Sequence, residues 1–246
     1  MQDAFYSAPL AKESQFLFAF EDSIQPASQL TWIFFTQGFC DSTHLFGERL
    51  SWDLQDFNSS EVVVLQYVDD IFLCTEREEA CSRASEDFLN FLAGCSNQES
   101  REKAQVCQQS VRYLGLIISE GTRAIGPERI KPILNHSLPM TLRELRGFFG
   151  ITGYCHIWRP AYEEPAQPLY KLIAESQQAQ TDKLVWSPDT HKSLMVLKIA
   201  LLQAPALSLP TGSEFNLFAT ERKGVALGVL TQPQGPHQQP IDYAEN

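Results

Sequence analysis

The sequence predicts an α+β fold, in which helices and strands follow one another in irregular order. Residues 61–74 (EVVVLQYVDDIFLC) contain two short apolar runs around a polar centre, which is typical of a β-hairpin. Residues 42–57 and 78–95 instead repeat apolar side chains every three or four positions, which is the period of a helix. The chain has 246 residues, 43% of them hydrophobic, which is enough for one large domain or two small ones, each with a core.

The first part of the chain is predicted to form two strands and a helix. Residues 15–20 (QFLFAF) and 30–35 (LTWIFF) are rich in aromatic side chains, and a turn-forming segment separates them. The helix covers residues 42–57. Its apolar face consists of Phe46, Leu50, Leu54 and Phe57.

The polar centre of the next segment is expected to be the tip of a hairpin. Residues 62–67 and 71–74 are β-branched and aromatic, so they are predicted to be its two strands. The residues near the tip are Val68, Asp69 and Asp70. A helix is predicted over 78–95, and residues 111–119 (VRYLGLIIS) read as another strand that Gly115 interrupts.

The second half of the chain begins with a strong helix signal. Residues 141–158 have an apolar face, and Thr141 with Glu144 forms a T-x-x-E capping box in front of it. Three prolines then predict the end of helical structure, namely Pro160, Pro165 and Pro168. Residues 174–182 (AESQQAQTD) read as a short linker.

The last part is predicted to contain a helix and a second hairpin. Ser187 and Pro188 mark the helix start, because proline is favoured at the first helical position. Residues 215–220 and 225–231 are the expected strands, joined by the turn ERKG. The chain ends in a polar and proline-rich segment, TQPQGPHQQPIDYAEN.

Targeting signals and metal motifs are missing from the sequence. No apolar run approaches the roughly 20 residues of a membrane span, and the N-terminal residues do not resemble a secretory signal. The six cysteines occur singly, without the CxxC spacing of zinc or redox sites. We therefore expect reduced thiols, a cytoplasmic or nuclear location and no membrane partner.

Charge is distributed unevenly along the chain. The net charge of −11 argues against a nucleic-acid partner. However, residues 1–100 carry 4 Lys and Arg against 17 Asp and Glu, whereas residues 101–171 carry 10 against 6. The basic middle segment could hold a phosphate backbone, although ordinary variation of surface charge explains the same numbers.

Two adjacent carboxylates at a hairpin tip have a simple and a functional explanation. Asp is a common turn residue because its side chain bonds nearby backbone N–H groups. The functional alternative is Mg²⁺ binding for phosphoryl transfer, since Mg²⁺ takes oxygen ligands and usually one or two carboxylates together with substrate phosphates. Composition alone favours the first explanation for Asp69 and Asp70.

Short segments spread along the whole chain favour the functional explanation. The central one is YVDD, residues 67–70. The others are QLTW (29–32), QGF (37–39), KAQVC (103–107), VRYLG (111–115), LREL (142–145), FFG (148–150), LLQAPAL (201–207) and GVLTQ (228–232). In this order they resemble the segments of gammaretroviral, murine-leukaemia-like reverse transcriptases, as found in endogenous retroviral pol genes.

The resemblance implies a polymerase palm with the YVDD hairpin, a helical thumb and a partial RNase H-like connection. The palm would cover residues 1–118, the thumb 119–178 and the connection 179–246. It implies RNA-directed DNA polymerase activity by two-metal nucleotidyl transfer, with Mg²⁺, or Mn²⁺ in its place. The implied partners are an RNA/DNA template–primer and deoxynucleoside triphosphates.

The resemblance also assigns roles to individual residues. Asp69 and Asp70 would be catalytic metal ligands. Residues near the incoming nucleotide would be Phe5, Gln37, Tyr67 and Val68. The primer grip would consist of Tyr113, Leu114 and Gly115, and the residues on the duplex would be Arg143, Arg146 and Gly150. Without the resemblance, core packing and solvated surface would be the preferred explanations for all of these positions.

One departure from the family pattern concerns the active site. The family's third carboxylate would fall just before Met1, and the fingers segment has no counterpart. We therefore expect weak metal binding and little or no polymerase activity from this chain, unless it associates with an intact polymerase or a missing upstream segment. Two alternatives stay open: a non-catalytic protein that binds template–primer or a partner, and a decayed reading frame without a selected function.

Overall fold

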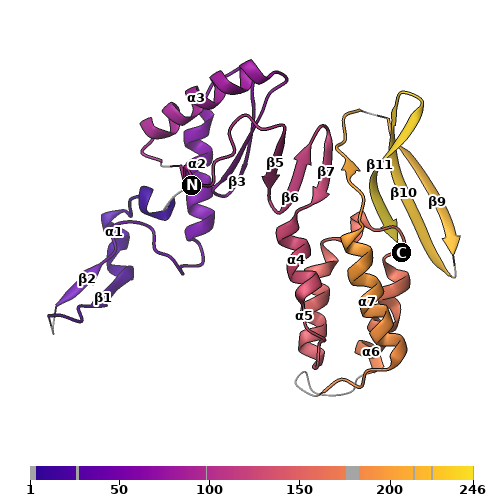
Figure 1. Cartoon of the computed structure of the whole chain (residues 1–246). Helices are drawn as coiled ribbons and strands as arrows, with labels where there is room; N and C mark the ends of the chain where they lie inside the picture. The colour runs from indigo at the N-terminus through magenta and orange to yellow at the C-terminus, as the bar shows by residue number, and fades with distance from the viewer. Residues whose placement is uncertain are drawn as a thin grey trace. The chain divides into compact units, whose positions relative to one another are not determined.

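The computed structural model describes residues 4–25, 28–97, 99–175, 183–212, 214–222 and 224–245. The chain forms two compact units, Met1–Gln108 and Gln109–Asn246 (Figure 1). Both contain helices together with small antiparallel sheets, so the predicted α+β class is confirmed.

The first unit pairs its strands as two separate hairpins. Its elements are η1 (Ala4–Ser7), α1 (Lys12–Gln15), η2 (Phe16–Phe18), β1 (Ala19–Glu21), β2 (Gln29–Thr31), α2 (Ser42–Gln55), β3 (Val63–Tyr67), β4 (Asp70–Cys74) and α3 (Glu78–Gly94). Strand β1 pairs with β2 and β3 with β4, both antiparallel.

The core of the first unit lies between helices α2 and α3. Phe46 and Leu50 of α2 are fully buried against Phe88 and Leu92 of α3. These residues come from the faces that the helical period predicted, so both helices are confirmed. The inward side chains of the β3–β4 hairpin, including Val64, pack against the same cluster.

The two aromatic strands predicted near the N-terminus are mostly wrong. Only the three residues of β1 pair with β2, and Phe16–Phe18 forms a 3₁₀ turn instead. The backbone N–H of Leu10 donates to Ile33 O, and that of Phe35 donates to Ala8 O. Residues 33–35 therefore use their backbone groups on the 8–10 segment, which ends the predicted ladder at Thr31.

The second unit contains two sheets and four helices. Its elements are β5 (Ser110–Tyr113), β6 (Leu116–Ser119), β7 (Thr122–Ile125), α4 (Pro127–Asn135), α5 (Leu142–Gly153), η3 (His156–Trp158), α6 (Glu163–Glu175), α7 (Pro188–Leu202), β8 (Leu207–Ser208), β9 (Asn216–Arg222), β10 (Val225–Gln234) and β11 (His237–Glu245). One sheet has the order β5-β6-β7-β8 and the other β11-β10-β9. Figure 1 shows the helices side by side at one end of the unit.

The helices of the second unit share one buried cluster. It consists of Ile133, Phe148, Cys155, Tyr162, Ala166, Leu169, Leu194, Leu197 and Leu201. The predicted caps are present: Thr141 Oγ1 accepts from the Glu144 N–H at 3.2 Å, and Ser187 with Thr190 forms a capping box on α7. Helix α5 ends at Gly153, earlier than predicted, and the chain continues as a 3₁₀ turn.

The prediction that three prolines end helical structure is wrong for two of them. Pro160 lies between η3 and α6, outside both helices, but α6 contains Pro165 in its first turn, where the missing N–H costs little, and Pro168 inside the helix. Ala166 and Leu169 are fully buried there, and this burial stabilises the helix. The polar, proline-rich C-terminal residues form strand β11, which pairs with β10, and a register shift after Leu230 brings Pro240 opposite Thr231.

The four-stranded sheet contains residues from the predicted palm, the predicted thumb and the predicted connection. Strand β8 pairs with β7 through Thr122 with Ser208 and Arg123 with Leu207. The Trp158 indole N–H donates to Arg123 O at 3.1 Å, and the Arg123 guanidinium donates to Ile241 O at 3.1 Å. The division into palm, thumb and connection remains a prediction, and the predicted linker at 174–182 falls almost wholly outside the described residues.

None of the helices in the described ranges is both long and apolar enough to cross a membrane.

Candidate functional site

The YVDD segment forms the predicted hairpin turn. Tyr67 pairs with Asp70, so Val68 and Asp69 are the two turn residues and Asp70 opens strand β4. Val68 has φ 55°, in the left-handed region that β-branched residues rarely adopt. Tyr67 is 59% exposed and Asp70 is exposed, whereas Asp69 is half-buried. The turn thus presents two carboxylates from a strained backbone.

The side-chain amide of Gln66 joins this turn to helix α2. The Gln66 side chain donates to Gly47 O at 2.9 Å and to Val68 O at 3.0 Å. A Cβ added at Gly47 would lie 3.9 Å from Val68 Cα, so the helix and the turn are close neighbours. Gln66 therefore satisfies the carbonyl of the strained residue and joins it to the helix backbone.

A third carboxylate lies in the electrostatic field of the pair. Burial raises the pKa of Glu99, and the negative charges of Asp69 and Asp70 raise it further. Even so, the described residues contain no group of three His, Cys, Asp or Glu side chains that could hold a metal ion. Asp69 and Asp70 provide two adjacent oxygen donors, which fits a Mg²⁺ ion that completes its shell with water and substrate phosphates.

Two of the predicted nucleotide-binding residues lie in the same unit as the turn. Phe5 packs edge-to-face on Phe46 of α2, with ring centroids 5.8 Å apart, so it is at least partly a core residue. Gln37 is exposed in a turn with Gly38. Their contacts with a nucleotide remain predictions.

The second hairpin carries the predicted primer grip. Residues 111–119, predicted as one interrupted strand, are two antiparallel strands with Tyr113 opposite Leu116. Leu114 and Gly115 form the turn with φ 50° and 76°, and positive φ at both central residues is the signature of a type I′ turn.

Arg129 of helix α4 clamps this second turn. Its guanidinium donates to Leu114 O at 2.8 Å and lies 4.1 Å from the centroid of the Tyr154 ring, after helix α5. A Cβ added at Gly115 would lie 2.0 Å from Arg129 Nε, so a larger residue there would displace the Arg129 side chain. The Gly126 N–H also donates to Gly115 O at 2.9 Å. Sequence reasoning missed Arg129, because nothing in its spacing from the YLG segment marks it as a neighbour.

Helix α5 has an exposed face with two arginines and with glycines that leave the helix backbone uncovered. Arg143, Arg146 and Gly150 lie on this face, opposite the buried Leu142, Leu145 and Phe148. A Cβ added at Gly147 or Gly150 would meet nothing within 4 Å. A negatively charged polymer could therefore approach the helix backbone closely at this face.

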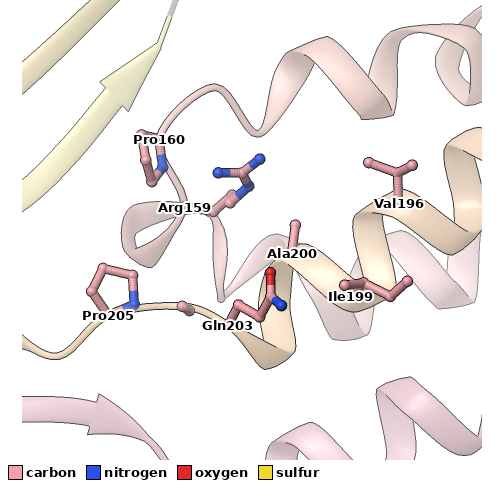
Figure 2. A pocket seen from close by; sticks show the side chains of 8 residues that line it. Arg159, Pro160, Val196, Ile199, Ala200, Gln203 and Pro205 are labelled. Atoms are coloured by element: carbon pink, nitrogen blue, oxygen red, sulfur yellow. The ribbon is translucent and has the colours of Figure 1, made fainter.

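A pocket of about 310 Å³ lies elsewhere in the second unit (Figure 2). The Arg159 side chain extends over Ala200 and Gln203 at the end of α7, and Pro160 and Pro205 close one side. None of the predicted site residues lines this pocket.

Known proteins share both the fold and the sequence of these units. Residues 1–118 match the family described as "Reverse transcriptase (RNA-dependent DNA polymerase)". The foamy viral protease–reverse transcriptase in complex with double-stranded DNA superposes with a TM-score of 0.87 at 24% identity, over 100% of this chain and 42% of that one. The same protein with an RNA/DNA hybrid gives a TM-score of 0.80 at 25% identity, over 100% and 32%. Residues 1–118 belong to the reverse transcriptase family.

Within that family, the relatives are Pol polyproteins of gammaretroviral and endogenous retroviral type, as the sequence motifs predicted. The chain is 44% identical to the Pol polyprotein of Feline endogenous virus ECE1 and 43% identical to the Gag-Pol polyprotein of Avian reticuloendotheliosis virus. Identity to the Gag-Pol polyprotein of Gibbon ape leukemia virus is 39%. Each match covers 99% of this chain but only 23%, 21% and 14% of these three relatives, in that order.

Proposed function

We propose that this chain provides the YVDD carboxylates and the primer-holding hairpin of an RNA-directed DNA polymerase. The observation that carries the proposal is the tight turn at Val68 and Asp69, which presents two adjacent carboxylates at the end of a hairpin backed by α2. The assignment of palm, thumb and connection to residues 1–118, 119–178 and 179–246 belongs to the same proposal.

In this proposal the side chains bind and orient the reactants. Asp69 and Asp70 would hold Mg²⁺ or Mn²⁺, whose chemistry is to lower the pKa of the attacking hydroxyl and to neutralise phosphate charge. Residues next to the primer end and the deoxynucleoside triphosphate would be Tyr67, Val68, Phe5 and Gln37. Tyr113, Leu114 and Gly115 would fix the primer terminus, which needs a rigid turn because small displacements of a reacting atom slow the reaction strongly.

Primer extension tests the catalytic proposal. The purified chain is given an RNA template with a DNA primer and deoxynucleoside triphosphates, in Mg²⁺ and in Mn²⁺. We expect little or no extension by the chain alone, and metal-dependent extension once an upstream segment with the family's third carboxylate and fingers is joined to it. Asp69→Asn should abolish that extension, and Asp87→Asn, at an exposed position of α3, should leave it unchanged. Extension that persists in Asp69→Asn, or no extension by the folded, extended chain in either metal, would contradict catalysis at this turn.

The second candidate function is template–primer binding without catalysis. It is favoured by the exposed basic face of α5. When binding releases counterions, the logarithm of the binding constant falls linearly with log[salt]. The slope is about −0.9 for each phosphate contact on a B-form duplex.

Fluorescence anisotropy with a labelled RNA–DNA duplex, over a range of salt, tests this candidate. Arg143→Gln with Arg146→Gln is expected to lower the salt slope by about 2, since two phosphate contacts are lost. Lys192→Gln, at an exposed position of α7, removes a charge from the same unit as a control. Equal slopes for all variants would argue against the α5 face as the duplex-binding surface.

A further inference from the structure

Three side chains on one face of helix α3 lie next to the thiol of Cys107. Glu78, Cys81 and Ser85 are three and four residues apart, which places them on a single helical stripe. Ser85 Oγ lies 4.0 Å from Cys107 Sγ. Cys81 lies one helical turn before Ser85 on the same stripe, close enough for its side chain to raise the pKa of the Cys107 thiol. The two sulfur atoms are therefore already neighbours, although their residues are far apart in the chain.

The surroundings of this sulfur pair differ from those of the other cysteines. Cys81 and Cys107 are both half-buried, so a small oxidant can reach them. Cys107 has φ 50°, an uncommon conformation for a residue with a side chain, in the segment that leads from α3 to β5. By contrast, the thiol of Cys95 lies near Asp53 and Arg49, and that of Cys155 near Arg129.

From this geometry we infer that Cys81 and Cys107 are a redox pair, which hydrogen peroxide converts to a disulfide. The inference goes beyond the proposed polymerase function and does not depend on it. The bond would join helix α3 to a residue three positions before β5, the first strand of the hairpin with the Leu114 and Gly115 turn. Oxidation would thereby fix the chain segment that enters that hairpin.

The reaction balances with peroxide as the only co-reactant. The Cys81 thiolate attacks one peroxide oxygen, the O–O bond breaks, and water leaves while Cys81 becomes a sulfenic acid. The sulfur of Cys107 then attacks the sulfenic sulfur, the S–S bond forms, and the hydroxyl leaves with the Cys107 proton as a second water. The two thiols lose two electrons, which peroxide takes up.

The order of the two steps follows from the environment of Cys107. Burial raises the pKa of the Cys107 thiol, and the hydrogen bond with Cys81 raises it further. Because the thiolate is the nucleophile, a thiol that stays protonated reacts slowly with peroxide. Cys107 is therefore expected to act second, on the sulfenic acid of its neighbour.

Peptide mapping of the full, peroxide-treated chain tests the inference. The reduced chain is exposed to a range of peroxide concentrations, free thiols are blocked, and the protein is digested and analysed by mass spectrometry without reductant. We expect free thiols to fall from six to four, with one linked peptide pair containing Cys81 and Cys107, and full reversal by dithiothreitol. Linkage of other cysteines first, or separate oxidation of Cys81 and Cys107 without a bond, would overturn the inference.

Serine variants provide a second measurement. Cys81→Ser is expected to leave Cys107 reduced at peroxide concentrations that oxidise it fully in the unaltered chain. Cys107→Ser is expected to leave Cys81 as a sulfenic acid that dimedone traps. Cys40→Ser, at an exposed position, is the matched control and should still form the bond. Unchanged oxidation of Cys107 in Cys81→Ser would contradict the inference without relying on the peptide map.

Discussion

Two of the tight hairpins, residues 63–74 and 110–119, have the same length of turn but different supports. Each turn begins with a bulky residue in the left-handed region, Val68 in one and Leu114 in the other. The first turn is held by a neutral amide from its own strand, and the hairpin is a separate two-stranded sheet. The second is held by a guanidinium from another helix, and its strands belong to a four-stranded sheet.

The two turns are stabilised in different ways, one by a glycine and a charged donor and the other by a neutral amide and a neighbouring helix. The Leu114 turn uses glycine at its second position and a charged donor at its carbonyl, so its conformation is favoured locally and reinforced from outside. The Val68 turn has neither glycine nor a charged donor, and its strain is balanced by Gln66 and the neighbouring α2. The turn with the carboxylates is therefore the more strained of the two.

The largest expected effect is that of Gly115→Ala. An alanine at φ 76° has a conformational cost of about 1–2 kcal/mol, and its Cβ would overlap Arg129, which adds about 1–3 kcal/mol. Gly121→Ala is the matched control, since Gly121 has φ 74° but open space around it. Chemical denaturation should show the larger loss of stability for Gly115→Ala. Equal losses for the two variants would show that Arg129 does not clamp the turn.

Arg129→Met is expected to have the next largest effect, about 2 kcal/mol. It removes a charge-assisted hydrogen bond to Leu114 O and the contact with the Tyr154 ring. Hydrogen exchange should speed up in residues 110–119 but not in residues 63–74, and Lys131→Met, at an exposed position of α4, should change neither. In the Arg129→Met background, Gly115→Ala should cost less than it does alone, which a double-mutant cycle measures.

Gln66→Leu should have a smaller effect, about 1 kcal/mol, because the lost hydrogen bonds come from a neutral donor. Exchange should become faster around residues 63–74 and stay unchanged in the second hairpin. If Gln66→Leu destabilised its hairpin more than Arg129→Met destabilises the other, the contrast between the two supports would be wrong.

Val68→Gly is expected to change stability least, by less than about 0.5 kcal/mol. Glycine relieves the left-handed strain of about 1–2 kcal/mol, but it loses more backbone entropy on folding and the packing of the side chain. Thermal unfolding of the variant and the unaltered chain measures the difference. A marked loss of stability would mean that Val68 is held by packing and is not strained.

The sequence predicted those elements whose signals are local. Capping residues and apolar periods located α5 and α7, and the alternation around YVDD located its hairpin. Elements that depend on distant contacts were missed: α6 tolerates Pro168 because its neighbours are buried, and β11 is a strand because β10 pairs with it. Propensity cannot anticipate such tertiary effects.

The candidate site shows the same division. Asp69 and its hairpin could be found from a short motif, and so could Gly115, because the motif and the turn are the same residues. Gln66, Glu99 and Arg129 could not, because each acts through a contact with a segment that is remote in the chain or through its burial. Arg129 stabilises the Leu114 turn only because folding brings its guanidinium within hydrogen-bonding distance of the Leu114 carbonyl.

The pairing of β8 with β7 also has a consequence for synthesis of the chain. Leu207 is made 84 residues after its partner Arg123 (207 − 123), which at about 5–20 residues per second corresponds to roughly 4–17 s of translation. During that interval the outer edge of β7 lacks its native neighbour, and an open strand edge is a template for association with other chains. The nascent protein is thus most exposed to misassembly while the helices between these strands are still emerging from the ribosome.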